Sequence, residues 1–272
     1  MSKRVAAIHD LSGLGRCSLT AAIPVLSALG LQACPVPTAV LSCQTGFSHF
    51  HLADGTEWMD HFIEDWRRCG LTPDGIYTGF LAGEAQVEKV EGFLTAFRTP
   101  QTLLVVDPVL GDGGQLYKGC TADLCRRMAA LAARADVITP NLTEACLLCG
   151  ESYEAFAADD PALPQRVLAL ARRLAQGGRQ VVITGVDHGD AIYNIAAGRE
   201  EFLVKTPRQA GHFSGTGDLF TSVVCGGYLR GLSLRQSVEL ATRLIAAAIA
   251  DTYGMPENGV EFERHLHILT EV

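Results

Sequence analysis

The sequence lacks the features of membrane-bound and nucleic-acid-binding proteins. No apolar run approaches the roughly 18 residues that a membrane-spanning helix needs. The first residues show no signal-peptide pattern, so we expect a cytoplasmic protein with no membrane partner. Lysine and arginine do not cluster, and the net charge is −8, which argues against nucleic acid as a partner.

Several motifs of well-known enzyme classes are also missing. The chain contains neither a G-x-x-x-x-G-K-[ST] phosphate loop nor the H-R-D and D-F-G pair of protein kinases. It has no G-x-S-x-G element, which disfavours a hydrolase. Gly13 and Gly15 are spaced as in a dinucleotide-binding turn, but the third glycine is absent, so the match is weak.

The nine cysteines do not form the pattern of a disulfide framework. Their number is odd and their spacing is irregular, so we expect reduced thiols. Cys146 and Cys149 form a C-x-x-C pair in a helix-like stretch, without a second pair or a histidine cluster at zinc spacing. Metal or redox use of this pair is therefore disfavoured.

The sequence does contain a regular alternation of strand-like and helix-like segments. We expect strands over residues 5–9, 32–38, 75–78, 102–107, 136–139 and 180–184, and a hairpin over 191–197 and 201–206. We expect helices over residues 18–29, 57–69, 83–97, 122–133, 142–149, 162–176, 219–229 and 234–253. The alternation predicts an α/β fold, with a mostly parallel central sheet and helices on both faces. We expect one domain over residues 1–272.

Polar residues follow several of the expected strands. Ligands of such a sheet bind beyond the carboxyl ends of its strands. The residues in question are Asp10 and Ser12 after the first strand, Asp107 and Asp112 after the fourth, Thr139 and Asn141 after the fifth, and Thr184 after the sixth. All of them are candidates for one shared site.

A glycine-rich segment, residues 215–218 (GTGD), stands directly before an apolar helix. The free N–H groups of a helix N-terminus attract anions, and glycines let a phosphate approach the backbone closely. Asp218 would repel a phosphate, so we interpret it as a base that takes a proton from an attacking hydroxyl. The segment therefore predicts a small-molecule kinase. The alternative is an ordinary helix start in which Thr216 or Asp218 stabilises the first turn.

Other oxygen-bearing side chains suit a metal ion. Asp107 and Asp112 flank a proline turn and offer the hard oxygen ligands that Mg²⁺ prefers. Asn141 and Glu144 stand one helical turn apart and can hold a metal-bound water. The alternatives are a turn residue at Asp107 and a capping arrangement around Asn141.

Taken together, these motifs resemble the ribokinase-like superfamily and, within it, the pyridoxal (vitamin B6) kinases. The resemblance runs nearly end to end. It rests on residues 107–112 (DPVLGD), 139–145 (TPNLTEA) and 215–220 (GTGDLF), with 10–13 (DLSG) and 42–47 (SCQTGF) similar to the two vitamin-contacting segments. The pair 107–112 and 215–220, in this order along the chain, is the most specific part of the resemblance.

The resemblance implies a role for each candidate residue. Asp218, with an ordinary pKa, accepts the proton of the 5′-hydroxymethyl group, and Gly215, Thr216 and Gly217 donate N–H groups to the transferred phosphoryl. Asp112, Thr139, Asn141, Glu144 and Thr184 bind ATP; Asp107, Asp112 and Glu144 bind Mg²⁺; and Ser12, Thr45 and Gly46 bind the vitamin. The family is usually homodimeric and often uses K⁺, so both are expected here.

Some questions stay open from the sequence. Cys43 stands where other branches carry asparagine, either as a ring contact or as a small apolar filler, and the preferred vitamer is undecided. Kinases of hydroxymethylpyrimidine share the fold but usually carry cysteine in place of Asp218. A sugar kinase of the same fold and a non-enzymatic carrier or sensor of B6 vitamers or nucleotide are the remaining alternatives.

Overall fold

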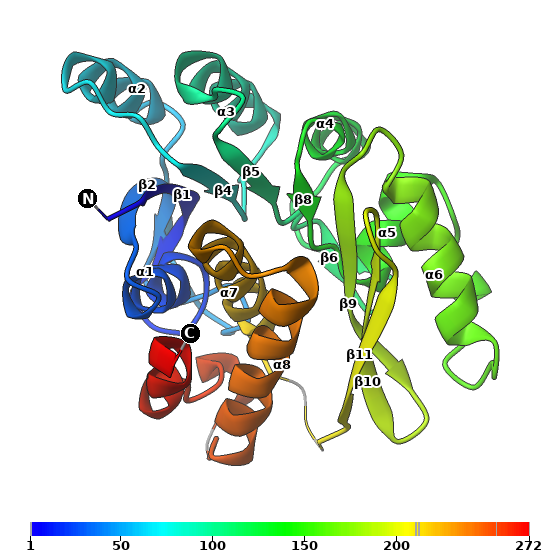
Figure 1. Ribbon diagram of the computed structural model, residues 1–272. Helices are drawn as coiled ribbons and strands as arrows, with labels where there is room; N and C mark the ends of the chain where they lie inside the picture. Colours follow the sequence, from blue (N-terminus) through cyan, green and yellow to red (C-terminus); the bar gives the residue numbers. More distant parts are fainter. Residues whose placement is uncertain (1, 210, 212, 254, 272) are drawn as a thin grey trace. The chain divides into compact units, whose positions relative to one another are not determined.

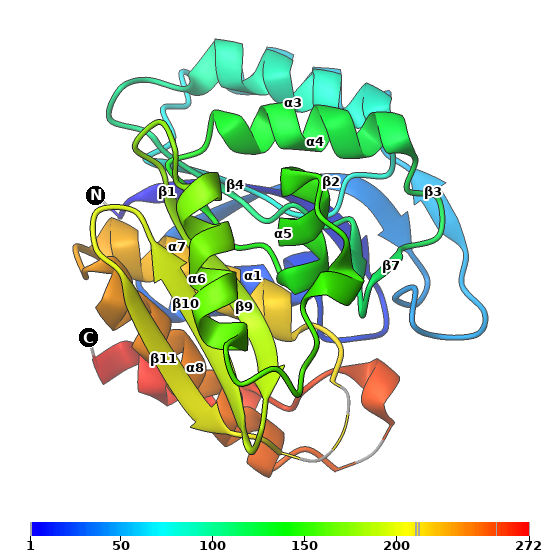
Figure 2. The same ribbon diagram turned by 90° about the vertical axis from the view of Figure 1, so that its right-hand side faces the viewer.

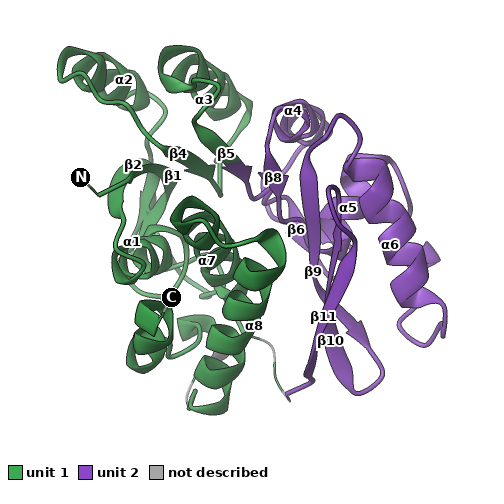
Figure 3. Cartoon of the chain, viewed as in Figure 1, with its two compact units in different colours: residues 1–104, 210–272 green, residues 105–209 purple. Residues whose placement is uncertain are grey.

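The structure is a computed structural model that describes residues 2–271 apart from residues 210, 212 and 254. The chain divides into two compact units: residues 1–104 with 210–272, and residues 105–209 (Figure 3). The assignment of one domain to residues 1–272 stays a prediction.

The first unit is built on parallel strands. They are β1 (Arg4–Ser12), β2 (Gln32–Leu41) and β4 (Gly75–Thr78), followed at the edge by the short β3 (Leu52–Asp54). Strand β1 pairs in parallel with both β2 and β4, whereas β3 runs antiparallel to β2. Because β1 has neighbours on both sides, its residues Val5, Ala6, Ala7 and Ile8 are completely buried. A strand that is buried in the middle of the sheet needs apolar side chains on both of its faces, and residues 5–8 provide them.

Helices surround this part of the sheet. They are α1 (Ser18–Ala28), α2 (Met59–Arg68), α3 (Glu84–Phe97), α7 (Thr216–Arg230) and α8 (Leu234–Ala250), with the 3₁₀ segments η2 (Pro256–Asn258) and η3 (Glu263–Glu271). Helix α7 packs against both α1 and α8 (Figure 1). Helix α1 contains Pro24 in its interior. This packing fixes the first turn of α7 close to the end of β1.

The second unit has a parallel part and an antiparallel hairpin. Strand β5 (Leu103–Val106) contains the boundary between the units and pairs in parallel with β8 (Val137–Ile138), which pairs in parallel with β9 (Gln180–His188). Strands β10 (Ala191–Ala197) and β11 (Phe202–Pro207) continue antiparallel from β9, and β6 (Gly111–Asp112) and β7 (Gln115–Leu116) form a separate small pair.

The helices of this unit are α4 (Ala122–Ala133), α5 (Leu142–Cys149), α6 (Leu163–Leu174) and the 3₁₀ turn η1 (Tyr153–Ala155). Helix α6 lies along β9 and β10 (Figure 2). Its apolar residues Val167, Leu170 and Ala171 are buried, while Arg172 and Arg173 on its other side are exposed. The amphipathic pattern seen in the sequence therefore decides which side of α6 packs on the sheet.

The predicted α/β fold with a mostly parallel central sheet and helices on both faces is confirmed. Several boundaries differ by three residues or more. Strands β1 and β2 continue to Ser12 and Leu41, so Ser12 lies within β1 and not after it, and α8 ends at Ala250. Strand β9 continues past Thr184 to His188 because Asp187 and His188 pair with the start of β10. Helix α7 begins at Thr216 instead of Leu219, since Gly215 serves as its N-cap. The short strands β3, β6 and β7 were not predicted. No helix among the described residues is long and apolar enough to cross a membrane.

Candidate active site

In the first unit, the end of β1 carries two buried polar side chains. The Ser12 hydroxyl donates a hydrogen bond to Asp10 Oδ2 over 3.1 Å, and both residues are shielded from solvent. Burial raises the pKa of Asp10, and hydrogen bonds from the Ser18 and Ser12 hydroxyls oppose this effect. Ser12 is completely buried, so contact between its hydroxyl and a vitamin requires that this oxygen become accessible on binding.

The first turn of α7 has the geometry of an anion site. Gly215 is the N-cap in a left-handed conformation (φ +76°), and no side chain caps the helix. The first helical hydrogen bond runs from the Leu219 N–H to the Gly215 carbonyl, so the amides of residues 216–218 lie outside this ladder. The Thr216 hydroxyl instead donates to the carbonyl of Phe213. Neither Thr216 nor Asp218 therefore caps the helix through its side chain, although Asp218 does lie in the first turn, as in the alternative of an ordinary helix start.

Asp218 lies in this turn with its side chain only 16% exposed. Burial raises its pKa to about 7; the Ser18 backbone N–H, which donates to the carboxylate, opposes this shift, and the negative charge of Asp10 adds to it. The ordinary pKa expected from the sequence is thus wrong, because the residue is largely removed from water. A carboxylate with this pKa is well matched to accept a proton near neutral pH.

The backbone of Asp218 is also held in place. The hydroxyls of Tyr77 and Ser222 donate to its carbonyl oxygen over 3.3 and 2.6 Å. Ser18, whose amide faces the carboxylate, has a positive φ of 47°, the only non-glycine residue with positive φ in the described chain. Such a conformation is unfavourable for serine and is kept where the surrounding structure imposes it.

The loop that carries the predicted vitamin contacts is anchored by Gln44. Its backbone N–H donates to the Leu14 carbonyl, its Oε1 accepts from the Gly46 N–H, and its Nε2 donates to the Glu257 carbonyl. Gln44 is buried, whereas Thr45 and Gly46 are exposed on the loop. The anchoring by Gln44 was not recognised from the sequence, because its partners lie up to 213 residues away.

The second unit gathers most of the predicted nucleotide-binding residues around the start of α5. Asn141 Oδ1 accepts from the Glu144 N–H, and Glu144 Oε2 accepts from the Asn141 N–H, each over 2.9 Å. Glu144 Oε1 also accepts from the Leu110 N–H, and Asn141 Nδ2 donates to the Gly111 carbonyl. The capping alternative for Asn141 is confirmed, and the same side chains hold the 107–112 loop against α5.

Thr139 and Thr184 extend this cluster along the sheet. Thr139 is buried at the end of β8, and its N–H donates to the carbonyl of Val106. Thr184 is half-buried in β9, forms a parallel bridge with Asn141 and donates its N–H to the Pro140 carbonyl. The predicted convergence at the carboxyl ends of the strands is therefore present within this unit.

Negative charge accumulates at this place. Burial raises the pKa of Glu144 well above its ordinary value, and the charges of Asp107 and Asp112 add to the shift, while the backbone N–H groups of Asn141 and Leu110 oppose it. A divalent cation would bind the hard oxygen atoms of these three carboxylates and reduce the repulsion between their negative charges. Within the described part of the chain, however, no group of three or more His, Cys, Asp or Glu side chains is arranged to hold a metal ion. A Mg²⁺ ion bound at this place would therefore have to take its remaining ligands from phosphates and water.

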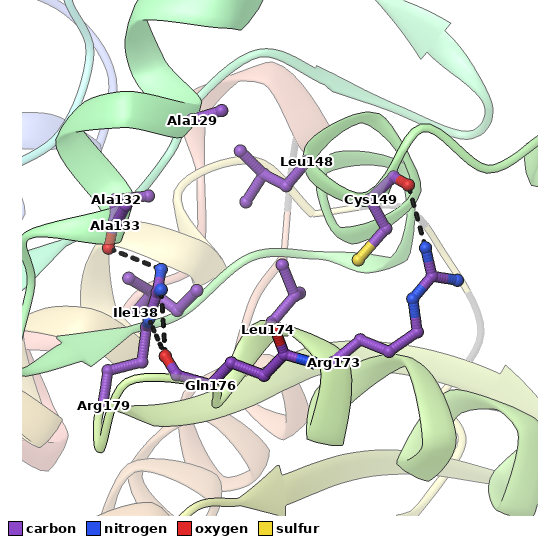
Figure 4. Close-up of a pocket in the computed structure, with 10 residues that line it drawn as sticks. All are labelled: Ala129, Ala132, Ala133, Ile138, Leu148, Cys149, Arg173, Leu174, Gln176 and Arg179. Atoms are coloured by element: carbon purple, nitrogen blue, oxygen red, sulfur yellow. Dashed lines mark hydrogen bonds between the residues drawn. The ribbon is translucent and has the colours of Figure 1, made fainter.

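A separate hollow of about 350 Å³ lies where helices α4, α5 and α6 end (Figure 4). Arg179 donates to the carbonyls of Ala132 and Gln176, and Arg173 donates to the carbonyl of Cys149. Both arginines thus bind carbonyl groups at or just beyond the ends of these helices. None of the predicted site residues lines this hollow, so it is not part of the candidate active site.

The mostly parallel sheet with its covering helices is the fold of the ribokinase-like kinases. Residues 15–261 match the phosphomethylpyrimidine kinase family. The chain belongs to this family. The resemblance to pyridoxal kinases is confirmed, and with it the class of enzyme.

Three relatives show how far the similarity extends. The pyridoxine/pyridoxal/pyridoxamine kinase of Bordetella avium is 31% identical over 255 residues, covering 88% of this chain and 81% of that protein. A Bacteroides thetaiotaomicron structure with pyridoxal, of a protein provisionally assigned as a phosphomethylpyrimidine kinase, is 39% identical with a TM-score of 0.91, covering 99% and 96% of the two chains. The pyridoxal kinase structure of Lactobacillus plantarum is 30% identical with a TM-score of 0.87, covering 100% and 97%.

Proposed function

We propose that this protein transfers the γ-phosphoryl group of ATP to the 5′-hydroxymethyl group of a vitamin B6 vitamer (pyridoxal, pyridoxine or pyridoxamine). Asp218 takes the hydroxyl proton while the oxygen forms its bond to phosphorus. The bond from phosphorus to the bridging oxygen breaks, and its electron pair leaves with ADP. The N–H groups of Gly215, Thr216 and Gly217 stabilise the negative charge on the transferred group.

The observation that carries this proposal is the position and protonation behaviour of Asp218. It lies in the first turn of α7 among free amides, and its raised pKa of about 7 makes it a competent base at neutral pH. The pyridoxal-bound structure with 39% identity supports a B6 vitamer as the acceptor. Thr45 and Gly46, on the loop anchored by Gln44, contact its ring together with Ser12.

The residues of the second unit bind MgATP in this proposal. Asp112, Thr139, Asn141 and Thr184 approach the nucleotide, and Asp107, Asp112 and Glu144 face the Mg²⁺ ion, directly or through water. The metal supplies charge neutralisation for the phosphates. A homodimer, a cytoplasmic location, one domain over residues 1–272 and use of K⁺ belong to the same proposal.

Hydroxymethylpyrimidine is the second candidate acceptor. It resembles the vitamin in shape, and the matched family is named after a pyrimidine kinase. Asp218 favours the vitamin, since the pyrimidine kinases usually carry cysteine at this position.

The test is ATP consumption by the purified protein with Mg²⁺ and each of pyridoxal, pyridoxine, pyridoxamine and hydroxymethylpyrimidine, with Asp218→Ala as the control. Turnover on a B6 vitamer that disappears in the variant supports the proposal and ranks the vitamers. Turnover only on the pyrimidine assigns the second candidate. Binding of vitamers without turnover indicates a carrier or sensor.

A further inference from the structure

His9 lies on β1, in the interior of the first unit. It is completely buried, and neither ring nitrogen has a hydrogen-bond partner among the described residues. Buried polar groups without partners are rare in folded proteins and need an explanation. The explanation should lie in what surrounds the ring.

The surroundings of His9 form a closely fitted niche. A Cβ at residue 79 would lie 2.2 Å from His9 Nδ1, so the ring occupies the space that glycine leaves open. The ring of Tyr77 packs edge-on at 4.1 Å between centroids. His9 Nδ1 then lies 3.9 Å from Asp218 Oδ1, slightly beyond hydrogen-bond distance. The niche therefore directs this nitrogen toward the proposed base.

We propose that His9 is the positioning residue of Asp218: in the substrate-bound enzyme its Nδ1–H donates a hydrogen bond to Asp218 Oδ1, which leaves the other carboxylate oxygen to take the substrate proton. Hydrogen bonds in active sites are often long without substrate and shorten in the reactive complex. An orienting group behind the base is a recurrent arrangement in enzymes. This inference rests on the proposed function of Asp218.

The electrostatics agree with a neutral donor. Burial lowers the pKa of His9 to about 3, so the ring is uncharged wherever the enzyme can work and does not itself receive the proton. The other titratable groups around the pair are Asp10, whose charge raises the pKa of Asp218, and the buried thiol of Cys17, whose pKa is raised and which is neutral. The Tyr77 hydroxyl is bound to the Asp218 carbonyl. Apart from the Ser18 N–H, His9 is thus the donor best placed to keep the carboxylate ionised.

The first test compares His9→Leu with His9→Asn, whose amide nitrogen can take the place of Nδ1. Leucine cannot donate a hydrogen bond to the ionised carboxylate, so the pKa of Asp218 should rise in His9→Leu. The acidic limb of the kcat/KM profile should then move to higher pH by about one unit, and kcat should fall roughly tenfold. His9→Asn should restore both in large part. Equal losses of kcat in the two variants, with an unmoved acidic limb, would mean that His9 is only a structural residue and would overturn the proposal.

A second pair of variants leaves the imidazole in place. Gly79→Ala displaces the ring from the base and should reproduce the His9→Leu profile, provided that the melting temperature shows a folded protein. Gly83→Ala, where a Cβ has open space, is the matched control and should behave as wild type. A wild-type pH profile in folded Gly79→Ala would contradict the proposed contact.

A measurement without substrate separates this inference from the proposed function. The ¹³C carboxyl signal of Asp218, identified by its loss in Asp218→Asn, can be titrated by NMR in wild type, His9→Leu and His9→Asn. An upward shift of its pKa in His9→Leu alone supports the positioning role even if no vitamer is phosphorylated. No shift in either variant overturns the role even if the kinase activity is established.

Discussion

Gly215 lies directly against the backbone of Arg16. A Cβ at residue 215 would come 1.9 Å from the Arg16 carbonyl oxygen, and the backbone at this glycine has a φ of +76°. Two independent constraints thus exclude a side chain at the N-cap of α7. The contact holds the loop after β1 against the turn that carries Asp218. The position of Asp218 and of the neighbouring amides therefore depends on this contact.

We therefore expect Gly215→Ala to lower kcat/KM by about 100-fold, since a displacement of roughly 1 Å at the reacting groups costs this much. The matched control is Gly231→Ala at the other end of α7. It has a comparable positive φ of 98°, but a Cβ there meets nothing within 4 Å. The control should lose some thermal stability and keep its turnover. Equal kinetic effects of the two substitutions would contradict the special role of the Gly215–Arg16 contact.

Replacing the proposed base should stabilise the fold at alkaline pH. The folded protein holds the proton of Asp218 up to pH about 7, whereas the unfolded chain releases it near pH 4. This contribution to stability is complete below pH 4 and is lost as the pH rises through 7, by on the order of 4 kcal/mol. Asp218→Asn has no such loss. Its melting temperature should exceed that of wild type at pH 8, and the difference should shrink toward pH 5. A pH-independent difference would show that Asp218 is not buried as described.

Gln44 should matter for binding the vitamin more than for the chemical step. Gln44→Ala removes the side-chain links to Gly46 and to the Glu257 carbonyl, which hold the loop carrying Thr45. We expect the KM for the vitamer to rise about tenfold with little change in kcat. The exposed Gln101 provides the matched control, and Gln101→Ala should be kinetically silent. A fall in kcat at constant KM would assign Gln44 to the reaction centre instead.

The capping boxes of α5 and α8 allow the nucleotide site to be tested separately from stability. Asn141 and Glu144 cap α5, and Ser233 and Gln236 cap α8 in the same way. Asn141→Ala and Ser233→Ala should each cost about 0.5–2 kcal/mol of stability. Only Asn141 also holds the Gly111 carbonyl, so only its variant should raise the KM for MgATP, by roughly tenfold. Similar KM values for MgATP in both variants would contradict the placement of the nucleotide.

Local pattern was sufficient for most of the fold. Strands such as Gly75–Thr78 and helices such as Leu142–Cys149 have the predicted boundaries, because apolar periodicity and capping residues determine them within a few positions. The short strand Leu52–Asp54 escaped prediction because its pairing with β2, and not its composition, defines it.

The sequence motifs were sufficient to select the candidate site residues. They were not sufficient to predict the pKa values and neighbours of these residues. The motif at 215–218 identified Asp218, yet the raised pKa of its carboxyl comes from burial and from Asp10, which is 208 positions earlier in the chain. His9 carried no signal in the sequence, because its relation to Asp218 depends on how β1 and α7 meet. Such non-local properties follow only from the folded structure.

The most direct measurement is a single-turnover reaction of the protein with MgATP and pyridoxal, followed by detection of the 5′-phosphate ester by mass spectrometry. Wild type and Asp218→Asn are compared after nucleotide binding has been verified for both. We predict the ester in wild type and at least about a 100-fold slower reaction in Asp218→Asn. Formation of the ester at the wild-type rate in Asp218→Asn would contradict the assigned base, and absence of the ester in wild type would contradict the proposed activity on pyridoxal.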